Sequence, residues 1–206
     1  MTVPSETCDG LDERAAPMPV VEMPPDVPAL RVFYLYLTAG CNLHCRHCWI
    51  TPTFVHGKPV PGECLDFGLL QNAVAEAKPL GLAGAKLTGG EPVLHPRFRD
   101  IVDFLSAADL DLSIETNATL IDRALAVHLH DKTRLTRVAV SLDSPAAEQH
   151  DRFRGVKGAF AAAVSGIENL VAAGYRPQII MSVFRENVGR IEELIELARR
   201  LGAGAV

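Results

Sequence analysis

The chain has 206 residues, of which 48% are hydrophobic, and a formal net charge of −5. This length and apolar content suit one folded domain and exclude a disordered chain. The negative charge argues against nucleic acid as a main partner, because phosphate binding usually requires a basic surface. No apolar stretch approaches the roughly 20 residues of a membrane span, and no export signal is recognisable, so we expect a cytoplasmic protein without a membrane partner.

Residues 1–28 are rich in proline and acidic residues and have little periodicity, which predicts a flexible leader before a core domain at 29–206. In the core, short apolar runs alternate with amphipathic helical patterns. The runs predict strands at 31–38, 84–88, 111–116, 136–142 and 178–184, the last two of them buried on both faces. Between and after them we expect helices capped by Asp66, opened by Pro96, over about 120–130 and 158–173, and capped by Asn187.

This repeated order of strand and helix predicts an α/β fold with a parallel sheet and outer helices. Five β/α units are visible, and the segment 202–206 resembles the approach to a sixth strand. A complete eight-unit barrel needs about 250 residues. We therefore expect a partial TIM-type (β/α) barrel, truncated before its sixth strand, within a longer protein.

Three cysteines, Cys41, Cys45 and Cys48, follow the first predicted strand within eight residues. Three thiolates on one loop can hold an iron–sulfur cluster, but a closed [4Fe–4S] site takes four ligands from the protein. An iron without a protein ligand can bind another molecule. A structural zinc site with His44 or His47 as the fourth ligand is the alternative, although no second pair of ligands follows at zinc-finger spacing.

The two other cysteines, Cys8 and Cys64, have no partner at a useful sequence spacing. We interpret Cys8 as part of the leader and Cys64 as a loop residue. A disulfide framework is not expected in a chain of this composition without an export signal.

Polar residues also stand at the end of every predicted strand. In parallel β/α folds the functional groups collect where strands end and loops begin. We therefore expect these residues to share one rim with the cysteines: Gly89, Gly90 and Glu91; Glu115, Thr116 and Asn117; Ser141 and Asp143; Ser182 and Arg185.

Each of these groups has a functional and a purely structural interpretation. Gly89 and Gly90 permit close backbone approach to a ligand, or they form a tight turn. Ser141 and Asp143 alternate on one face and can hold a ribose diol, or Asp143 caps the next turn. Arg154, further along, can clamp a carboxylate, or it is an ordinary surface arginine.

Two sets of motifs resemble a known family. The pattern C-x3-C-x2-C at Cys41–Cys48, with Gly89-Gly-Glu-Pro92, resembles the radical S-adenosylmethionine (radical SAM) superfamily. The elements Val140-Ser-Leu-Asp-Ser144 and His150-Asp-x-x-Arg154-Gly-x-x-Gly158-Ala-Phe160 are similar to its subgroup with a C-terminal SPASM or twitch extension, which includes peptide and sulfatase maturases. The resemblance spans about residues 31–206.

The resemblance implies a set of cofactor ligands. Cys41, Cys45 and Cys48 would ligate a [4Fe–4S] cluster whose fourth iron binds the amino and carboxylate groups of S-adenosylmethionine. Other residues would contact that molecule: His47 near the adenine, Gly89, Gly90 and Glu91 at the amino group, Ser141 and Asp143 near the ribose, and Arg154 at the carboxylate. Thr116 and Asn117 match a T-N-G element in which Ala118 replaces the glycine, and this departure puts the turn geometry in question.

The resemblance further implies reductive cleavage of S-adenosylmethionine to a 5′-deoxyadenosyl radical, which abstracts hydrogen from a substrate. The subgroup indicates a peptide or protein substrate and an electron donor such as a flavodoxin or ferredoxin. It assigns no catalytic residue beyond the cluster ligands. The alternatives are a radical SAM enzyme that acts on a small metabolite, and a non-catalytic iron–sulfur or metal-binding module of the same fold.

Overall fold

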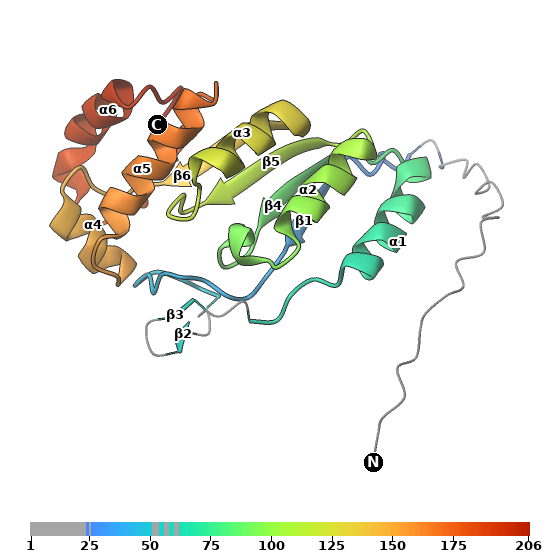
Figure 1. The fold of residues 1–206 in the computed structure, drawn as a ribbon, viewed down its shortest axis with the longest axis horizontal. Coiled ribbons are helices and arrows are strands. Elements are labelled where there is room, and N and C mark those ends of the chain that lie inside the picture. Colours follow the sequence, from blue (N-terminus) through green and yellow to red (C-terminus); the bar gives the residue numbers. More distant parts are fainter. Residues whose placement is uncertain (1–23, 25, 51–53, 56–57, 60–61) are drawn as a thin grey trace, which may run out of the picture.

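The protein folds around one parallel sheet, seen in the computed structural model that describes residues 24, 26–50, 54–55, 58–59 and 62–206 (Figure 1). The strands run in the order β1-β4-β5-β6-β7, and each pairs in parallel with its neighbour. They span Val32–Tyr36, Gly84–Thr88, Asp111–Thr116, Leu135–Ser141 and Gln178–Ile180. Nearly all of the predicted leader, including Cys8, lies outside the described residues.

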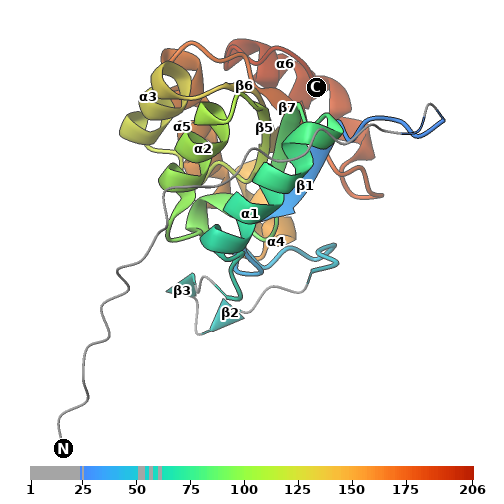
Figure 2. The same cartoon turned by 90° about the vertical axis from the view of Figure 1, so that its right-hand side faces the viewer.

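Helices follow the strands and cover one side of the sheet, as Figures 1 and 2 show from two directions. The predicted cap at Asp66 is confirmed, because its carboxylate accepts a hydrogen bond from the Leu69 N–H at the start of the first helix. The helices are α1 (Phe67–Ala77), α2 (Phe98–Ala107), α3 (Arg123–Lys132), α4 (Ala147–Arg154), α5 (Ala159–Ala172) and α6 (Ile191–Arg200), with 3-10 turns η1 (Lys78–Leu80), η2 (Pro92–Leu94) and η3 (Val188–Arg190).

The hydrophobic core lies between these helices and the covered face of the sheet. Leu87, Ile114 and Val140 point into it from three strands and are fully buried or nearly so. Such burial contributes roughly 1.5–3 kcal/mol for each large side chain. The predicted α/β architecture, a parallel sheet with outer helices that does not close into a full barrel, is confirmed.

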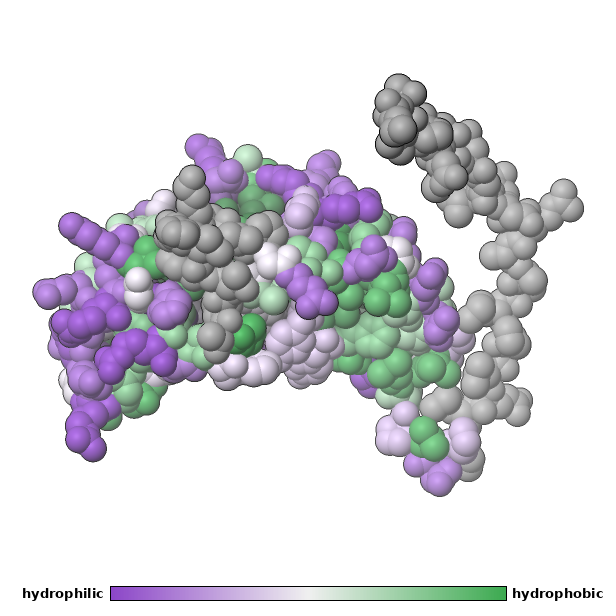
Figure 3. All heavy atoms as spheres, turned by 90° about the horizontal axis from the view of Figure 1, so that it is seen from below, coloured by the Kyte–Doolittle hydropathy of each residue, from purple (hydrophilic) through white to green (hydrophobic). Residues whose placement is uncertain are grey.

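The other face of the sheet is open, which corrects the expectation that the strands predicted at 136–142 and 178–184 are buried on both faces. In β6, Thr136 and Arg137 are exposed. In β1 the exposed residues Val32, Tyr34 and Tyr36 alternate with partly buried ones, and Tyr34 keeps 66% of its surface exposed. In β7 the pattern is exposed, buried, exposed. The five strands of this sheet form only part of a barrel wall, and among the described residues no opposite strand fills its interior. Figure 3 shows the arched outline that this open curvature gives the molecule.

The end of the chain begins to extend the sheet. Ala205 forms a parallel bridge with Gln178, and its carbonyl accepts a hydrogen bond from the Ile179 N–H at 2.8 Å. The segment 202–206 therefore approaches β7 as a further strand would, as the sequence predicted.

Several local predictions were wrong. β7 ends at Ile180 rather than at residue 184. The N–H groups of Ser182 and Phe184 donate to the side chains of Asp143 and Asn187 and not to a neighbouring strand. The amide of Asn187 does not cap α6; it accepts from the Phe184 N–H and donates to the carbonyls of Asp143 and Ser182. The sequence analysis also missed α4, a short and mostly polar helix, and the hairpin of β2 (Phe54–Val55) and β3 (Lys58–Pro59).

Among the described residues, no helix has the length and apolar character needed to cross a membrane.

Candidate cluster and cofactor site

A cavity of about 340 Å³ lies at the carboxyl ends of the strands and gathers most of the predicted site residues. This position follows from the parallel topology, which brings the loops after each strand to one rim. Glu91 and Asp143 are not among the lining residues; both are buried behind the wall. Ser182 and Arg185, also expected at this rim, do not line the cavity either. The predicted residues that do line it are Cys41, Cys45, His47, Cys48, Gly89, Gly90, Glu115, Thr116, Asn117, Ser141 and Arg154.

The cysteine loop is held by backbone hydrogen bonds to the end of α4. The His44 N–H donates to the Arg154 carbonyl at 2.9 Å, and the Arg46 N–H donates to the Phe153 carbonyl at 3.0 Å. Gly155 follows with φ of +74°, and a Cβ there would lie 2.3 Å from the His44 carbonyl oxygen. Helix α4 and its glycine therefore fix the path of the loop.

The three thiols themselves are shielded to different extents. Cys41 is buried, whereas Cys45 and Cys48 are half-buried. Burial raises the pKa of Cys41 to about 12 and also raises the pKa of Cys45, although the guanidinium of Arg154 opposes the second shift. Both side chains are thus thiols at neutral pH, and metal binding here must release their protons.

The donor set suits an iron–sulfur cluster better than a single zinc ion. Thiolates are the usual ligands of such clusters, and three of them line this cavity. Within the described part of the chain, no group of three or more His, Cys, Asp or Glu side chains has the geometry to hold one metal ion. A cluster contains several atoms, so its ligands stand further apart than those of one ion. The ring of His47, a proposed zinc ligand, instead stacks on Phe153 with centroids 4.7 Å apart.

The turn after β4 packs directly against the loop that leads to the cysteines. The N–H of Gly90 donates to the Thr38 carbonyl at 2.7 Å, and the N–H of Glu91 donates to the Gly40 carbonyl at 2.8 Å. A Cβ on Gly90 would lie only 2.0 Å from the Gly40 oxygen, and Gly89 adopts φ of +137°. The two glycines are required because any side chain would separate these loops.

The carboxylate of Glu91 is directed toward the end of β5. It accepts hydrogen bonds from the Thr116 hydroxyl at 2.7 Å, the Asn117 N–H at 2.8 Å and, more weakly, the Val93 N–H at 3.3 Å. Its side chain is almost completely buried, and this burial raises its pKa to about 7 against the effect of those donors. In this arrangement Glu91 connects two neighbouring strand ends.

The turn after β5 keeps its shape despite the alanine that replaces glycine. Ala118 adopts φ of +58°, in the left-handed region, and its N–H donates to the Thr116 hydroxyl at 3.0 Å. The cost of this conformation for an alanine is about 1–2 kcal/mol. The side chain of Asn117 then donates to Asn42 at 2.9 Å and lies 3.8 Å from the Cys41 sulfur.

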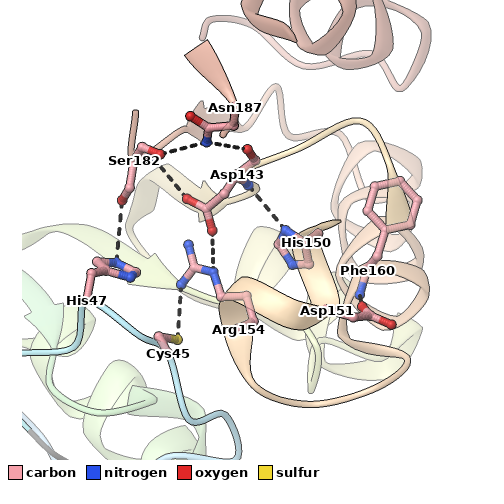
Figure 4. Close-up of polar contacts among 9 residues, drawn as sticks. All are labelled: Cys45, His47, Asp143, His150, Asp151, Arg154, Phe160, Ser182 and Asn187. Atoms are coloured by element: carbon pink, nitrogen blue, oxygen red, sulfur yellow. Dashed lines mark hydrogen bonds and ion pairs between the residues drawn. The ribbon is translucent and has the colours of Figure 1, made fainter. Parts of the chain in front are cut away.

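Asp143 and Arg154 form a buried ion pair beside the cysteine loop (Figure 4). The Arg154 Nε donates to the Asp143 Oδ2 at 2.5 Å, and its Nη1 donates to the Cys45 Sγ at 3.6 Å. The other oxygen of Asp143 accepts from the Ser182 N–H at 2.9 Å. Arg154 is only 7% exposed, so the interpretation as an ordinary surface arginine is wrong.

This ion pair also explains the polar residues around it. His150 accepts the Asp143 N–H through Nδ1 at 3.2 Å, and burial lowers the pKa of His150 to about 4. Asn187 donates to the carbonyl of Asp143 (Figure 4). Asp143 is fully buried and its carboxylate is already bound at both oxygens, so Ser141, and not Asp143, faces the cavity.

Sequence reasoning missed an aromatic wall of the cavity, formed by Tyr34, Tyr36 and Trp49. Tyr36 and Trp49 meet edge to face with centroids 5.9 Å apart, and Trp49 is 77% exposed. Lys86 and Glu115, which also line the cavity, form an ion pair at 2.5 Å, and the Lys86 Nζ lies 5.4 Å from the centroid of the Tyr34 ring. The alternation of residues in β1 could have indicated this face, if the barrel interior had been expected to stay open.

Past the Lys86–Glu115 ion pair, the open face of the sheet continues into a second cavity of about 620 Å³. Tyr34, Lys86 and Glu115 line both cavities and mark their boundary. The cysteine site therefore opens onto a larger concave surface along the inner face of the strands.

Comparison with known proteins identifies the family. The Radical SAM superfamily matches residues 35–198. The AdoMet-dependent heme synthase of Oleidesulfovibrio alaskensis is 34% identical over 86% of this chain and 45% of its own length. The mycofactocin maturase MftC of Mycobacterium ulcerans is 36% identical over 81% of this chain and 44% of its own.

Solved structures show the same fold. The structure of Streptococcus suis SuiB bound to S-adenosylmethionine covers 85% of this chain and 39% of its own, with a TM-score of 0.70 and 16% identity. The chain spans about half the length of the curated relatives it matches. Because the family match extends over most of the sequence, the chain belongs to the radical SAM superfamily.

Proposed function

We propose that this chain is the core of a radical SAM enzyme that modifies a peptide or protein. The observation that carries the proposal is the cavity that joins three thiols to the polar ends of β4, β5 and β6. Bound there, the family's cofactors, a [4Fe–4S] cluster and S-adenosylmethionine, supply one-electron cleavage of the sulfonium and a 5′-deoxyadenosyl radical that removes hydrogen from substrate.

In this proposal Cys41, Cys45 and Cys48 hold the cluster and leave one iron open for S-adenosylmethionine. Its polar groups would meet residues of the same cavity: His47 beside the adenine, Gly89 and Gly90 at the amino group, Ser141 at the ribose, Arg154 at the carboxylate, and Thr116 and Asn117 on the adjoining wall. Arg154 is suited to this, because a guanidinium has five N–H donors and only two are occupied by Asp143 and Cys45.

Glu91 and Asp143 would act on the cofactor from behind the cavity wall. Glu91 fixes the turn that carries Gly89 and Gly90 against the end of β5. Asp143 holds the guanidinium of Arg154 in place. We infer that their contribution to binding is orientation, which lowers the entropic cost of assembling the site.

A peptide substrate is supported by the names of several relatives and by the shape of the second cavity. MftC is a maturase, the Bacillus subtilis relative AlbA is a bacteriocin biosynthesis protein with 32% identity over 82% of this chain, and SuiB was solved with its precursor peptide SuiA. The second cavity provides an extended concave surface next to the proposed radical site. The heme synthase of similar identity favours a small-molecule substrate as the second candidate.

Other parts of the proposal concern the whole protein. We assign residues 29–206 to the core domain and 1–28 to a leader. We also propose a cytoplasmic location and an electron donor such as a flavodoxin or ferredoxin, since a cluster with an open iron requires a reducing environment.

Anaerobic reconstitution with iron and sulfide tests the cluster. We expect a broad visible absorbance in the wild-type chain and its loss when Cys41, Cys45 and Cys48 are all replaced by Ala. Cys64→Ala is the matched control, because Cys64 lies outside the cavity lining and should leave the absorbance unchanged. A band that survives the triple substitution contradicts the assignment.

Release of 5′-deoxyadenosine under dithionite then separates an enzyme from a binding module. We expect release that requires Cys41 and increases with the correct substrate class. Offering a peptide library and a tetrapyrrole in parallel distinguishes the two substrate candidates. A fully loaded cluster that never cleaves S-adenosylmethionine would support the non-catalytic alternative.

A further inference from the structure

We propose that Arg154 sets the reduction potential of the cluster through its contact with the ligand Cys45, and that Asp143 is the positioning residue that holds it there. This inference rests on the proposed function, because it requires a cluster on Cys41, Cys45 and Cys48. This effect of Arg154 on the cluster does not depend on S-adenosylmethionine.

The contact is built into the site. The Nη1 of Arg154 donates to the Cys45 Sγ at 3.6 Å, a normal distance for a hydrogen bond to sulfur. The guanidinium is 7% exposed, so water screens its charge only weakly. An arginine carries its charge at every relevant pH.

Asp143 fixes the orientation of the Arg154 guanidinium from the side opposite the cysteine loop. Asp143 is fully buried and binds the Arg154 Nε at 2.5 Å, while the Ser182 N–H donates to its other oxygen. Figure 4 shows the resulting chain of contacts from the β7 end through Asp143 and Arg154 to Cys45. The ion pair is thus an oriented dipole with its positive end at the sulfur of Cys45.

The direction of the effect follows from charge. Reduction adds an electron to the cluster and its thiolates, and a nearby cation with an N–H donor stabilises the added charge. Hydrogen bonds to the sulfurs and local charge are known determinants of cluster potentials. Arg154 should therefore raise the potential and make the cluster easier to reduce.

The test measures the midpoint potential of the reconstituted full chain by EPR-monitored titration, without S-adenosylmethionine. Omitting that molecule excludes any contribution from a contact of Arg154 with its carboxylate. We expect Arg154→Gln to shift the potential to more negative values and Arg154→Lys, which keeps the charge, to shift it less. Arg152→Gln, an exposed change on the same helix, is the matched control and should leave the potential unchanged.

Asp143 is tested by a double-mutant cycle. Asp143→Asn removes a buried negative charge, which by itself raises the potential with or without Arg154, and it also releases the guanidinium, which lowers the potential only when Arg154 is present. The shift caused by Asp143→Asn should therefore be more negative in the wild-type background than in the Arg154→Gln background. Additive shifts would overturn the assignment of Asp143 as a positioning residue.

Other outcomes are also decisive. An unchanged potential in Arg154→Gln with full iron content overturns the inference, and so does an equal shift in Arg152→Gln. If Arg154→Gln fails to fold, the comparison of Arg154→Lys with Arg152→Gln decides. A wild-type chain that assembles no cluster refutes the proposed function, and this inference fails with it.

Discussion

Two buried titratable side chains, Glu91 and His150, act in opposite directions on the stability of this fold. Burial raises the pKa of Glu91 to about 7, so its ionisation penalises the folded state as pH rises from 4.5 toward 7. Burial lowers the pKa of His150 to about 4, so stability increases as pH rises from 4 toward 6.5. The two contributions oppose each other where these ranges overlap, between about pH 4.5 and 6.5.

Glu91→Gln should therefore expose the effect of His150. We expect the free energy of unfolding of the metal-free variant to rise by a few kcal/mol between pH 4 and 6.5, since one pKa unit corresponds to about 1.4 kcal/mol. In the wild-type chain the rise should be smaller. Urea unfolding at several pH values, followed by circular dichroism, measures this difference. Identical pH dependence in both proteins would show that Glu91 has an ordinary pKa.

Gly90 is a steric requirement of the site rather than a flexible hinge. In Gly90→Ala the new Cβ would meet the Gly40 oxygen at 2.0 Å and separate the turn from the cysteine loop. We expect a loss of stability of at least 1–3 kcal/mol, the usual cost of overpacking, together with poor cluster assembly.

Gly189→Ala is the control for this substitution. No atom lies within 4 Å of a Cβ at Gly189, and its φ is not in the left-handed region. Thermal unfolding and iron content should stay near wild-type values for Gly189→Ala. Equal effects of the two substitutions would contradict the steric explanation.

At the scale of elements, helices α4 and α5 hold the cysteine loop in place. The end of α4 accepts its backbone hydrogen bonds, and Ala159 of α5 packs against Cys41 and Leu43. The motif from His150 to Phe160 contributes a structural contact at each of its defining positions. The Asp151 carboxylate accepts hydrogen bonds from the Phe160 N–H (Figure 4) and from the Gly158 N–H, and so caps α5. Gly155 lets the connection between the helices pass close to His44.

Asp151→Ala tests the cap. Removing an N-cap side chain costs about 1 kcal/mol, and two donors are lost here, so we expect a loss of about 1–2 kcal/mol. The midpoint of urea denaturation measures it. Glu148→Ala on the exposed face of α4 is the control, because the Glu148 side chain is 94% exposed and should contribute little. A loss no larger than that of the control would show that the cap does not stabilise α5.

For the molecule as a whole, the open inner face of the sheet matters most. It leaves the aromatic wall and the Lys86–Glu115 pair accessible beside the proposed radical site. The only tryptophan of the chain, Trp49, stands at the mouth of the cavity next to Cys48. Its fluorescence therefore reports on the state of the site.

Cluster assembly should quench the emission of Trp49, because a cluster on Cys48 lies close enough to accept its excitation energy. Titration of the metal-free chain with iron and sulfide, monitored by fluorescence, measures this. The variant with Cys41, Cys45 and Cys48 replaced by Ala should show no such quenching. Equal quenching in that variant would place the iron elsewhere.

The sequence by itself determined the α/β class, the order of the main elements and the position of the cysteine loop after the first strand. These follow from local signals, because hydrophobic periodicity, caps and the spacing of cysteines are all readable within a few residues. The parallel topology then places the strand ends, with Gly89, Gly90 and Ser141, at one rim without further information.

Only the tertiary structure decided which polar groups face the cavity and which lie behind it. Asp143, Glu91 and Asn187 are of polar types that are usually exposed in strand-end turns and helix caps, yet long-range partners bury them. Arg154 reaches Cys45, which is 109 positions away, and no local pattern encodes that contact. The exposure of one face of β1 could not be predicted from the sequence either. The burial of a strand depends on what packs against both of its faces, and that is decided by the whole sheet.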